Sequence, residues 1–135
     1  MIVADANVVA ALVMPHEDSS LAERLLRADG SWVAPPLILS ELRSVVATLV
    51  RNGRQSAAQG ASLFALAVEA LEAVTFEPNV RRVMELVAAS GCSSYDCEYV
   101  AVAEEIGCRL VTLDQAVLRA FPGIAARPEA IAGVH

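Results

Sequence analysis

Short apolar runs alternate along the chain with longer stretches whose apolar residues recur every three or four positions. The first pattern is typical of buried strands and the second of amphipathic helices. We expect strands at about residues 2–4, 32–34, 74–76 and 109–112. We expect helices at about residues 7–13, 20–28, 37–51, 56–72, 79–90, 93–106 and 115–120. This alternation predicts an α/β domain with a mostly parallel sheet.

Capping signals set the expected ends of these helices. Ser20 to Glu23 and Ser56 to Gln59 have the spacing of capping boxes, which begin helices. Gly91 and Gly107 are placed to end helices. The segment after Phe121-Pro122-Gly123 could add a short edge strand. We therefore expect three layers, in which helices flank a short sheet of four to five strands, and a single domain over residues 1–135.

Composition narrows the class of protein. The 135 residues, of which 56% are hydrophobic, fit one compact domain with a substantial core. No apolar run reaches the roughly 18 residues of a membrane span, and the N-terminus has no signal-peptide pattern, so we expect a cytosolic protein. Three cysteines (Cys92, Cys97 and Cys108) and two distant histidines fit reduced, packed thiols better than a disulfide framework or a zinc site.

The net charge of −6 argues against nonspecific coating of nucleic acid. It does not exclude a nuclease, because bound metal ions can reverse the local field. All ten basic residues are arginine.

Two apolar strands end at an aspartate, Asp5 in the first case and Asp114 in the second. Ligands of open α/β sheets bind beyond the carboxyl ends of the strands, so both carboxylates are expected in one crevice. The alternative is that each aspartate only caps the helix that follows it.

Two further acids are candidates for the same crevice. Glu41 is expected beside the apolar stripe of its helix, where an unpaired carboxylate is costly; pairing with Arg43 would be the structural alternative. Asp96 lies in the first turn of a helix, where the helix dipole alone would explain it. Together with Asp5 and Asp114, these acids would repel one another unless cations lay between them. Such a set of oxygen ligands suits Mg²⁺ or Mn²⁺, and we expect the four carboxylates to converge within about one coordination shell, directly or through water.

The order of motifs resembles that of the PIN domains, and within them the VapC-type toxins of toxin–antitoxin pairs. The matching segments are Asp5-Ala6-Asn7, Pro36 with Ser40-Glu41-Leu42, Ser94-Tyr95-Asp96 with Tyr99 and Ala101-Val102-Ala103, and Leu110-Val111-Thr112-Leu113-Asp114. The resemblance covers nearly the whole chain and implies a PIN-like, Rossmann-like fold. At the position of Asn7 the family often has Ser or Thr.

The resemblance also implies an activity, a cofactor and partners. The four acids would bind Mg²⁺, with Mn²⁺ as a substitute, and catalyse hydrolysis of RNA phosphodiester bonds. Asn7 and Thr112 would orient these acids from behind. The chain would form a homodimer and bind an antitoxin encoded beside it.

Parts of the sequence are compatible with other functions. Asp5-x-Asn7 after a strand loosely resembles the nucleophile motif of haloacid-dehalogenase-like phosphatases, but those enzymes and phospho-receiver domains rely on a lysine that this chain lacks. A P-loop nucleotide hydrolase is excluded for the same reason and by the absence of a glycine-rich loop. A catalytically inactive PIN-like module that binds RNA or protein is a further alternative, although the presence of all four acids argues against it.

Overall fold

The computed structural model describes residues 1–134. Its centre is a four-stranded sheet of β1 (Ile2–Ala4), β2 (Trp32–Val33), β3 (Leu110–Val111) and β4 (Ala125–Ala126). The strand order is β2-β1-β3-β4, and every pairing is parallel. In register, Ala4 lies opposite Val111, so the residues that follow β1 and β3 emerge side by side at one edge of the sheet.

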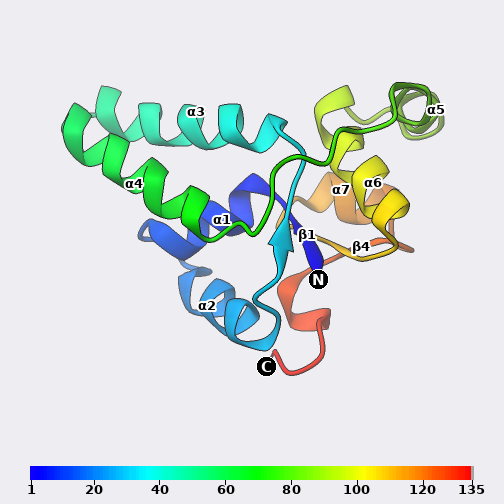
Figure 1. Cartoon of the computed structure of the whole chain (residues 1–135), viewed down its shortest axis with the longest axis horizontal. Coiled ribbons are helices and arrows are strands. Elements are labelled where there is room, and N and C mark those ends of the chain that lie inside the picture. The colour runs from blue at the N-terminus through cyan, green and yellow to red at the C-terminus, as the bar shows by residue number, and fades with distance from the viewer. Residues whose placement is uncertain (135) are drawn as a thin grey trace.

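Helices cover both faces of the sheet, as the all-apolar strands require. One group is α1 (Ala6–Val13), α2 (Ser19–Ala28), α3 (Leu37–Arg51) and α4 (Ala57–Glu69). The other group is α5 (Val80–Ser90), α6 (Ser94–Ile106) and α7 (Gln115–Ala120), and a short 3₁₀ helix, Pro128–Ala130, follows β4. Figure 1 shows α1 to α4 on the left of the sheet and α5 to α7 on its right. The expected three-layer α/β fold is therefore confirmed.

The core lies between these layers. All three residues of β1 are buried, and Trp32 and Leu25 are fully enclosed. Helices α3 and α4 form a hairpin that extends from one end of the molecule (Figure 1). The two helices approach closely at Gly60, where a Cβ would lie 2.8 Å from Val50 Cγ2 and 3.0 Å from Val46 Cγ1.

Two expectations about local structure are wrong. Residues 74–76 form no strand; the chain pairs with β2 only through the bridge between Val33 and Ala73 and then runs on to the next helix. The expected capping box from Ser20 to Glu23 is also absent, because α2 begins earlier, at Ser19. The hydroxyl of Ser19 instead donates to Met14 O and accepts from His16 N, which secures the preceding turn.

Other expectations about local structure are confirmed. Ser56 and Gln59 form a capping box, and Gly91 and Gly107 end their helices in the left-handed conformation. The short strand β4 occupies the expected edge.

The three cysteines are free within the described part of the chain. Among the helices of residues 1–134, none is both long and apolar enough to cross a membrane.

Candidate active site

The ends of β1 and β3 place Asp5 and Asp114 at neighbouring positions. Asp5 directly follows β1, and Asp114 lies three residues after the end of β3. Each residue also caps the helix that comes after it: Asp5 Oδ1 accepts from Ala6 N at 2.7 Å, and Asp114 Oδ1 accepts from Ala116 N at 2.8 Å. Asp5 and Asp114 therefore both cap a helix and lie at the crevice, so the capping role does not exclude a role in the site.

Thr112 connects these two acids. Its fully buried hydroxyl donates to Asp5 Oδ2 at 2.7 Å and accepts from Asp114 N at 3.1 Å. Asn7 contributes a second link to the same loop, because its Oδ1 accepts from Leu113 N at 3.3 Å. The side chains expected to orient the acids thus contact Asp5 and the loop that carries Asp114.

The Asp5 carboxyl is poorly solvated. Burial, which outweighs the hydrogen bond from Thr112, together with the charges of Glu41 and Asp96, raises the pKa of Asp5 to about 6 from its ordinary 3.8. A carboxylate whose ionised form is disfavoured in this way is characteristic of sites that bind a cation or a proton.

Glu41 reaches the crevice from α3, on the other side of the sheet edge from α6. The hydroxyl of Tyr99, on α6, donates a hydrogen bond to Glu41 Oε1. Burial and the charge of Asp96 raise the pKa of Glu41, while the bond from Tyr99 lowers it. The alternative pairing with Arg43 does not occur, because Arg43 donates to Ser40 and lies over the ring of Phe64.

Asp96 enters from the first turn of α6. Ser93 caps this helix by accepting a hydrogen bond from Asp96 N at 3.1 Å, which fixes the backbone and not the carboxylate. Burial and the charge of Asp114 raise the pKa of Asp96, while the hydroxyl of Ser93 lowers it. Its carboxylate is partly exposed, and no backbone N–H of residues 1–134 donates to it.

The four acids line one pocket of about 330 Å³, together with Ala6, Asn7, Ser44 and Val45. None of the lining residues is basic, and among residues 1–134 no cationic group forms an ion pair with any of the four carboxylates. The pocket is therefore a concentration of uncompensated negative charge at the carboxyl edge of the sheet.

The shared pocket brings the four carboxylates together, and their convergence within about one coordination shell, directly or through water, stays a prediction. In the described residues no three acidic, histidine or cysteine side chains are close enough to hold one metal ion. Mutual repulsion favours separation of the carboxylates, and their hydrogen bonds to Thr112, Tyr99 and the helix N-termini hold three of them in place. The chemistry of the donor set still suits a hard divalent cation, because every charged group in the pocket is a carboxylate.

The sequence places Tyr99 in a segment that resembles a PIN motif, but it indicates no role for this residue in the pocket. Tyr99 is buried, at 2% exposure, and its pKa is raised far above the ordinary range by burial and by the bond to Glu41, so it remains a donor. The available signal was its spacing: Tyr99 follows Asp96 by three residues and so lies on the same face of the helix.

A comparison with known families gives this site its context. The model of the PIN domain family matches residues 2–122. The chain belongs to the PIN domain family. Its match contains all four acids of the pocket together with Thr112 and Tyr99.

Similar PIN proteins carry a common description. The chain is 37% identical over 117 residues to "Ribonuclease VapC9" of Mycobacterium tuberculosis, which covers 84% of this chain and 86% of that protein. It is 29% identical over 126 residues to "Ribonuclease VapC3" of Pyrobaculum aerophilum, covering 91% and 96%. Within the PIN family, the chain therefore belongs to the group of VapC-type ribonucleases.

Two solved structures share the PIN fold of this chain. PAE2754 from Pyrobaculum aerophilum superposes with a TM-score of 0.72 at 21% identity, over 92% of this chain and 81% of that one. FitAcB from Neisseria gonorrhoeae superposes with a TM-score of 0.62 at 17% identity, over 97% and 100%. At these identities the likeness concerns the fold alone.

Proposed function

We propose that this VapC-type PIN domain hydrolyses RNA phosphodiester bonds at the acidic pocket, with Asp5, Glu41, Asp96 and Asp114 as its catalytic residues, and that it acts as the toxin of a toxin–antitoxin pair. The observation that carries the proposal is that four carboxylates from four different segments line one pocket without a compensating cation. Neither a structural α/β subunit nor a phosphatase that depends on lysine accounts for that arrangement.

The four carboxylates would hold Mg²⁺, or Mn²⁺ in its place, directly or through water. When bound, the ion supplies positive charge for the scissile phosphate and makes water more acidic. The carboxylates that would hold the ion are fixed by different contacts. Thr112 holds Asp5 and the start of α7 holds Asp114, whereas no backbone N–H of the described residues holds the carboxylate of Asp96.

Asp96→Asn is the sharpest test of this activity. The substitution removes one negative charge and leaves the cap from Ser93 intact, since that bond goes to the backbone of residue 96. We expect at least a 100-fold loss of Mg²⁺-dependent cleavage of single-stranded RNA, without loss of thermal stability. Glu105→Gln, at an exposed position of the same helix, is the matched control and should cleave normally.

The result also separates an enzyme from an inactive binding module. Cleavage that is equal in wild type and Asp96→Asn would come from a contaminant or from another site. Binding of RNA without any metal-dependent cleavage by the wild type would favour the module.

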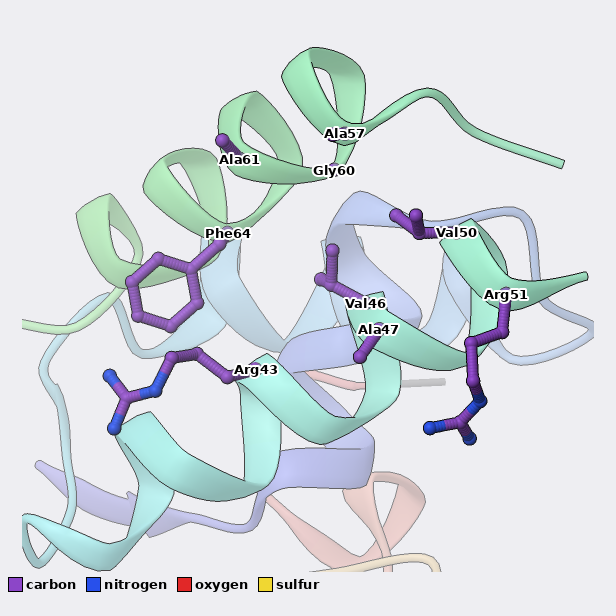
Figure 2. A pocket seen from close by; sticks show the side chains of 9 residues that line it. All are labelled: Arg43, Val46, Ala47, Val50, Arg51, Ala57, Gly60, Ala61 and Phe64. Atoms are coloured by element: carbon purple, nitrogen blue, oxygen red, sulfur yellow. The ribbon is translucent and has the colours of Figure 1, made fainter. Parts of the chain in front are cut away.

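We further propose that the antitoxin docks in the groove between α3 and α4. This groove holds about 520 Å³ and is lined by apolar side chains, among them Val46, Val50 and Phe64, with Gly60 on the side of α4 that faces α3 (Figure 2). Arg43 and Arg51 are its only charged lining residues. An apolar segment flanked by carboxylates is complementary to this surface, and a basic side chain further along the same partner could reach the acidic pocket.

The docking site can be tested without touching the acidic pocket. Ala61→Glu places a negative charge at an exposed position in the groove, whereas Ala65→Glu places it on α4 outside the groove lining. We expect Ala61→Glu to weaken binding of the neighbouring gene product at least 10-fold and to retain RNA cleavage. The site is wrong if both variants bind that protein equally well.

The remaining parts of the proposal are a single PIN-like domain over residues 1–135, a homodimer and a location in the cytosol with the RNA substrate. Light scattering on the purified chain checks the dimer. A monomer at micromolar concentration would contradict it.

A further inference from the structure

Tyr99 is the one buried tyrosine that points at the acidic pocket. Its side chain is 2% exposed, whereas that of Tyr95, on the same helix, is 60% exposed. A buried hydroxyl requires a hydrogen-bond partner, and the partner here is Glu41 Oε1. The hydroxyl therefore donates its only hydrogen to a carboxylate of the pocket.

The bond between Tyr99 and Glu41 connects two helices on different sides of the sheet. Glu41 lies on α3, part of the hairpin that extends from the body of the molecule, and Tyr99 lies on α6, which packs against β1 and β3. The bond thus fixes the orientation of the Glu41 carboxylate relative to α6, the helix that also carries Asp96. Within residues 1–134, no other group donates a hydrogen bond to the Glu41 side chain.

We propose that Tyr99 is a positioning residue that aims the Glu41 carboxylate into the acidic pocket and thereby sets the affinity of the pocket for its divalent cation. The inference rests on the proposed function, because it takes the pocket to be a metal site. Tyr99 itself would touch neither the metal nor the RNA. One oxygen of Glu41 is held by the phenol, and the other remains available to the cation.

A purely structural role predicts a different result. If Tyr99 only filled the core, removal of its hydroxyl would lower stability and leave metal binding unchanged. If it positions Glu41, removal of the hydroxyl would weaken metal binding even in a fully folded protein, because partners behind a ligand commonly contribute 10- to 100-fold in metal affinity.

The test measures Mn²⁺ binding directly, by the loss of the free-ion signal in electron paramagnetic resonance, on the purified chain without RNA. We expect Tyr99→Phe to raise the dissociation constant of Mn²⁺ roughly 10-fold. Tyr95→Phe is the matched control and should bind as the wild type does. Circular dichroism establishes that both variants are folded at the temperature used.

A double-mutant cycle identifies Glu41 as the group through which Tyr99 acts. In a Glu41→Gln background, Tyr99→Phe should change the dissociation constant less than twofold. Wild-type affinity in Tyr99→Phe, or an undiminished effect of that substitution in the Glu41→Gln background, would overturn the inference. Absence of Mn²⁺ binding by the wild type would instead overturn the metal site, and the positioning role with it.

A spectroscopic measurement keeps the test decisive if Tyr99→Phe does not fold. The chain has two tyrosines, so Tyr95→Phe leaves Tyr99 as the only one. Addition of Mg²⁺ to this variant should change the near-ultraviolet absorption of the phenol. The reason is that a cation bound to Glu41 would withdraw electron density from the carboxylate that accepts the hydrogen bond of the phenol. The change should disappear in a Tyr95→Phe, Glu41→Gln double variant, and its persistence there would overturn the inference.

Discussion

The four carboxylates differ in how firmly the backbone holds them. Asp5 and Asp114 accept hydrogen bonds from backbone N–H groups at helix N-termini, whereas the carboxylate of Asp96 accepts none from the backbone of the described residues. Substitution of each acid therefore has a different cost for the fold. Only the loss of charge is common to all, and it can be separated from the structural effect by measuring stability without metal.

Asp5→Asn should abolish cleavage and stabilise the metal-free protein at neutral pH. The pKa of Asp5 is raised from 3.8 to about 6 in the folded chain, mainly by burial, so the folded state keeps a proton that the unfolded state loses between these values. Stability is therefore lost as the pH rises through this window, by on the order of 3 kcal/mol. Asn cannot ionise and avoids most of this loss.

The measurement is urea unfolding of wild type and Asp5→Asn in EDTA, at pH values from 4 to 7. The two proteins should have similar free energies of unfolding near the low end of the range, and the variant should exceed the wild type near pH 7. Glu105→Gln should follow the wild-type curve throughout. Parallel curves for wild type and Asp5→Asn would mean that ionisation of Asp5 does not destabilise the folded protein.

Thr112→Val tests the link between Asp5 and Asp114. The substitution preserves shape but leaves Asp114 N without its acceptor and removes the donor to Asp5. We expect a loss of about 1–3 kcal/mol in the free energy of unfolding and a 10- to 100-fold decrease in cleavage. Thr48→Val, at an exposed site on α3, should change the activity less than twofold.

The sequence predicted some of these residues better than others. Asp5 and Asp114 could be found because a strand end fixes where the next side chain lies. Glu41 was found from its position beside an apolar stripe and from its segment's resemblance to a PIN motif, and neither signal shows what holds its carboxylate. Its bond to Tyr99 joins residues 58 positions apart, and no local pattern reports such a contact.

Among the helices and strands, those with strong local signals were predicted and the weakly determined segment was not. The capping box of α4 and the glycine ends of α5 and α6 depend on residues within one turn. Whether residues 74–76 form a strand depends instead on the neighbouring chain. Trp32 O and Ala34 N bond to Glu72 and Ala73, just before that segment, and the pairing ends there.

The packing of α3 on α4 gives a prediction about the hairpin. Gly60→Ala would place a methyl group 2.8 Å from Val50 Cγ2, so a side chain or helix must shift. Overpacking costs about 1–3 kcal/mol, which exceeds the gain of up to about 1 kcal/mol in helix propensity. We expect a net decrease of about 1 kcal/mol in the free energy of unfolding, measured with urea.

Gly123→Ala is the matched control for this substitution, because nothing lies within 4 Å of a Cβ at that position. It should leave stability nearly unchanged. A Gly60→Ala protein as stable as the wild type would show that the hairpin can open without cost, and the groove between its helices would then lack a fixed shape.

For the molecule as a whole, charge determines which nucleic acid can approach. The net charge is −6, and the acidic pocket has no basic residue in its lining. Duplex binding generally relies on many phosphate contacts from Lys and Arg. A single strand can place one phosphate in a pocket of about 330 Å³ while its bases turn away from the protein.

We therefore expect cleavage of single-stranded or looped RNA and no cleavage of duplex DNA under the same Mg²⁺ concentration. The test uses one sequence as single-stranded RNA, RNA hairpin, single-stranded DNA and duplex DNA, with Asp96→Asn as the control for contaminating nucleases. Because few phosphate contacts are available, the rate on RNA should depend only weakly on salt between 50 and 200 mM, in contrast to a protein with many such contacts. Efficient duplex cutting that Asp96→Asn abolishes would show that a surface outside the pocket supplies the missing positive charge.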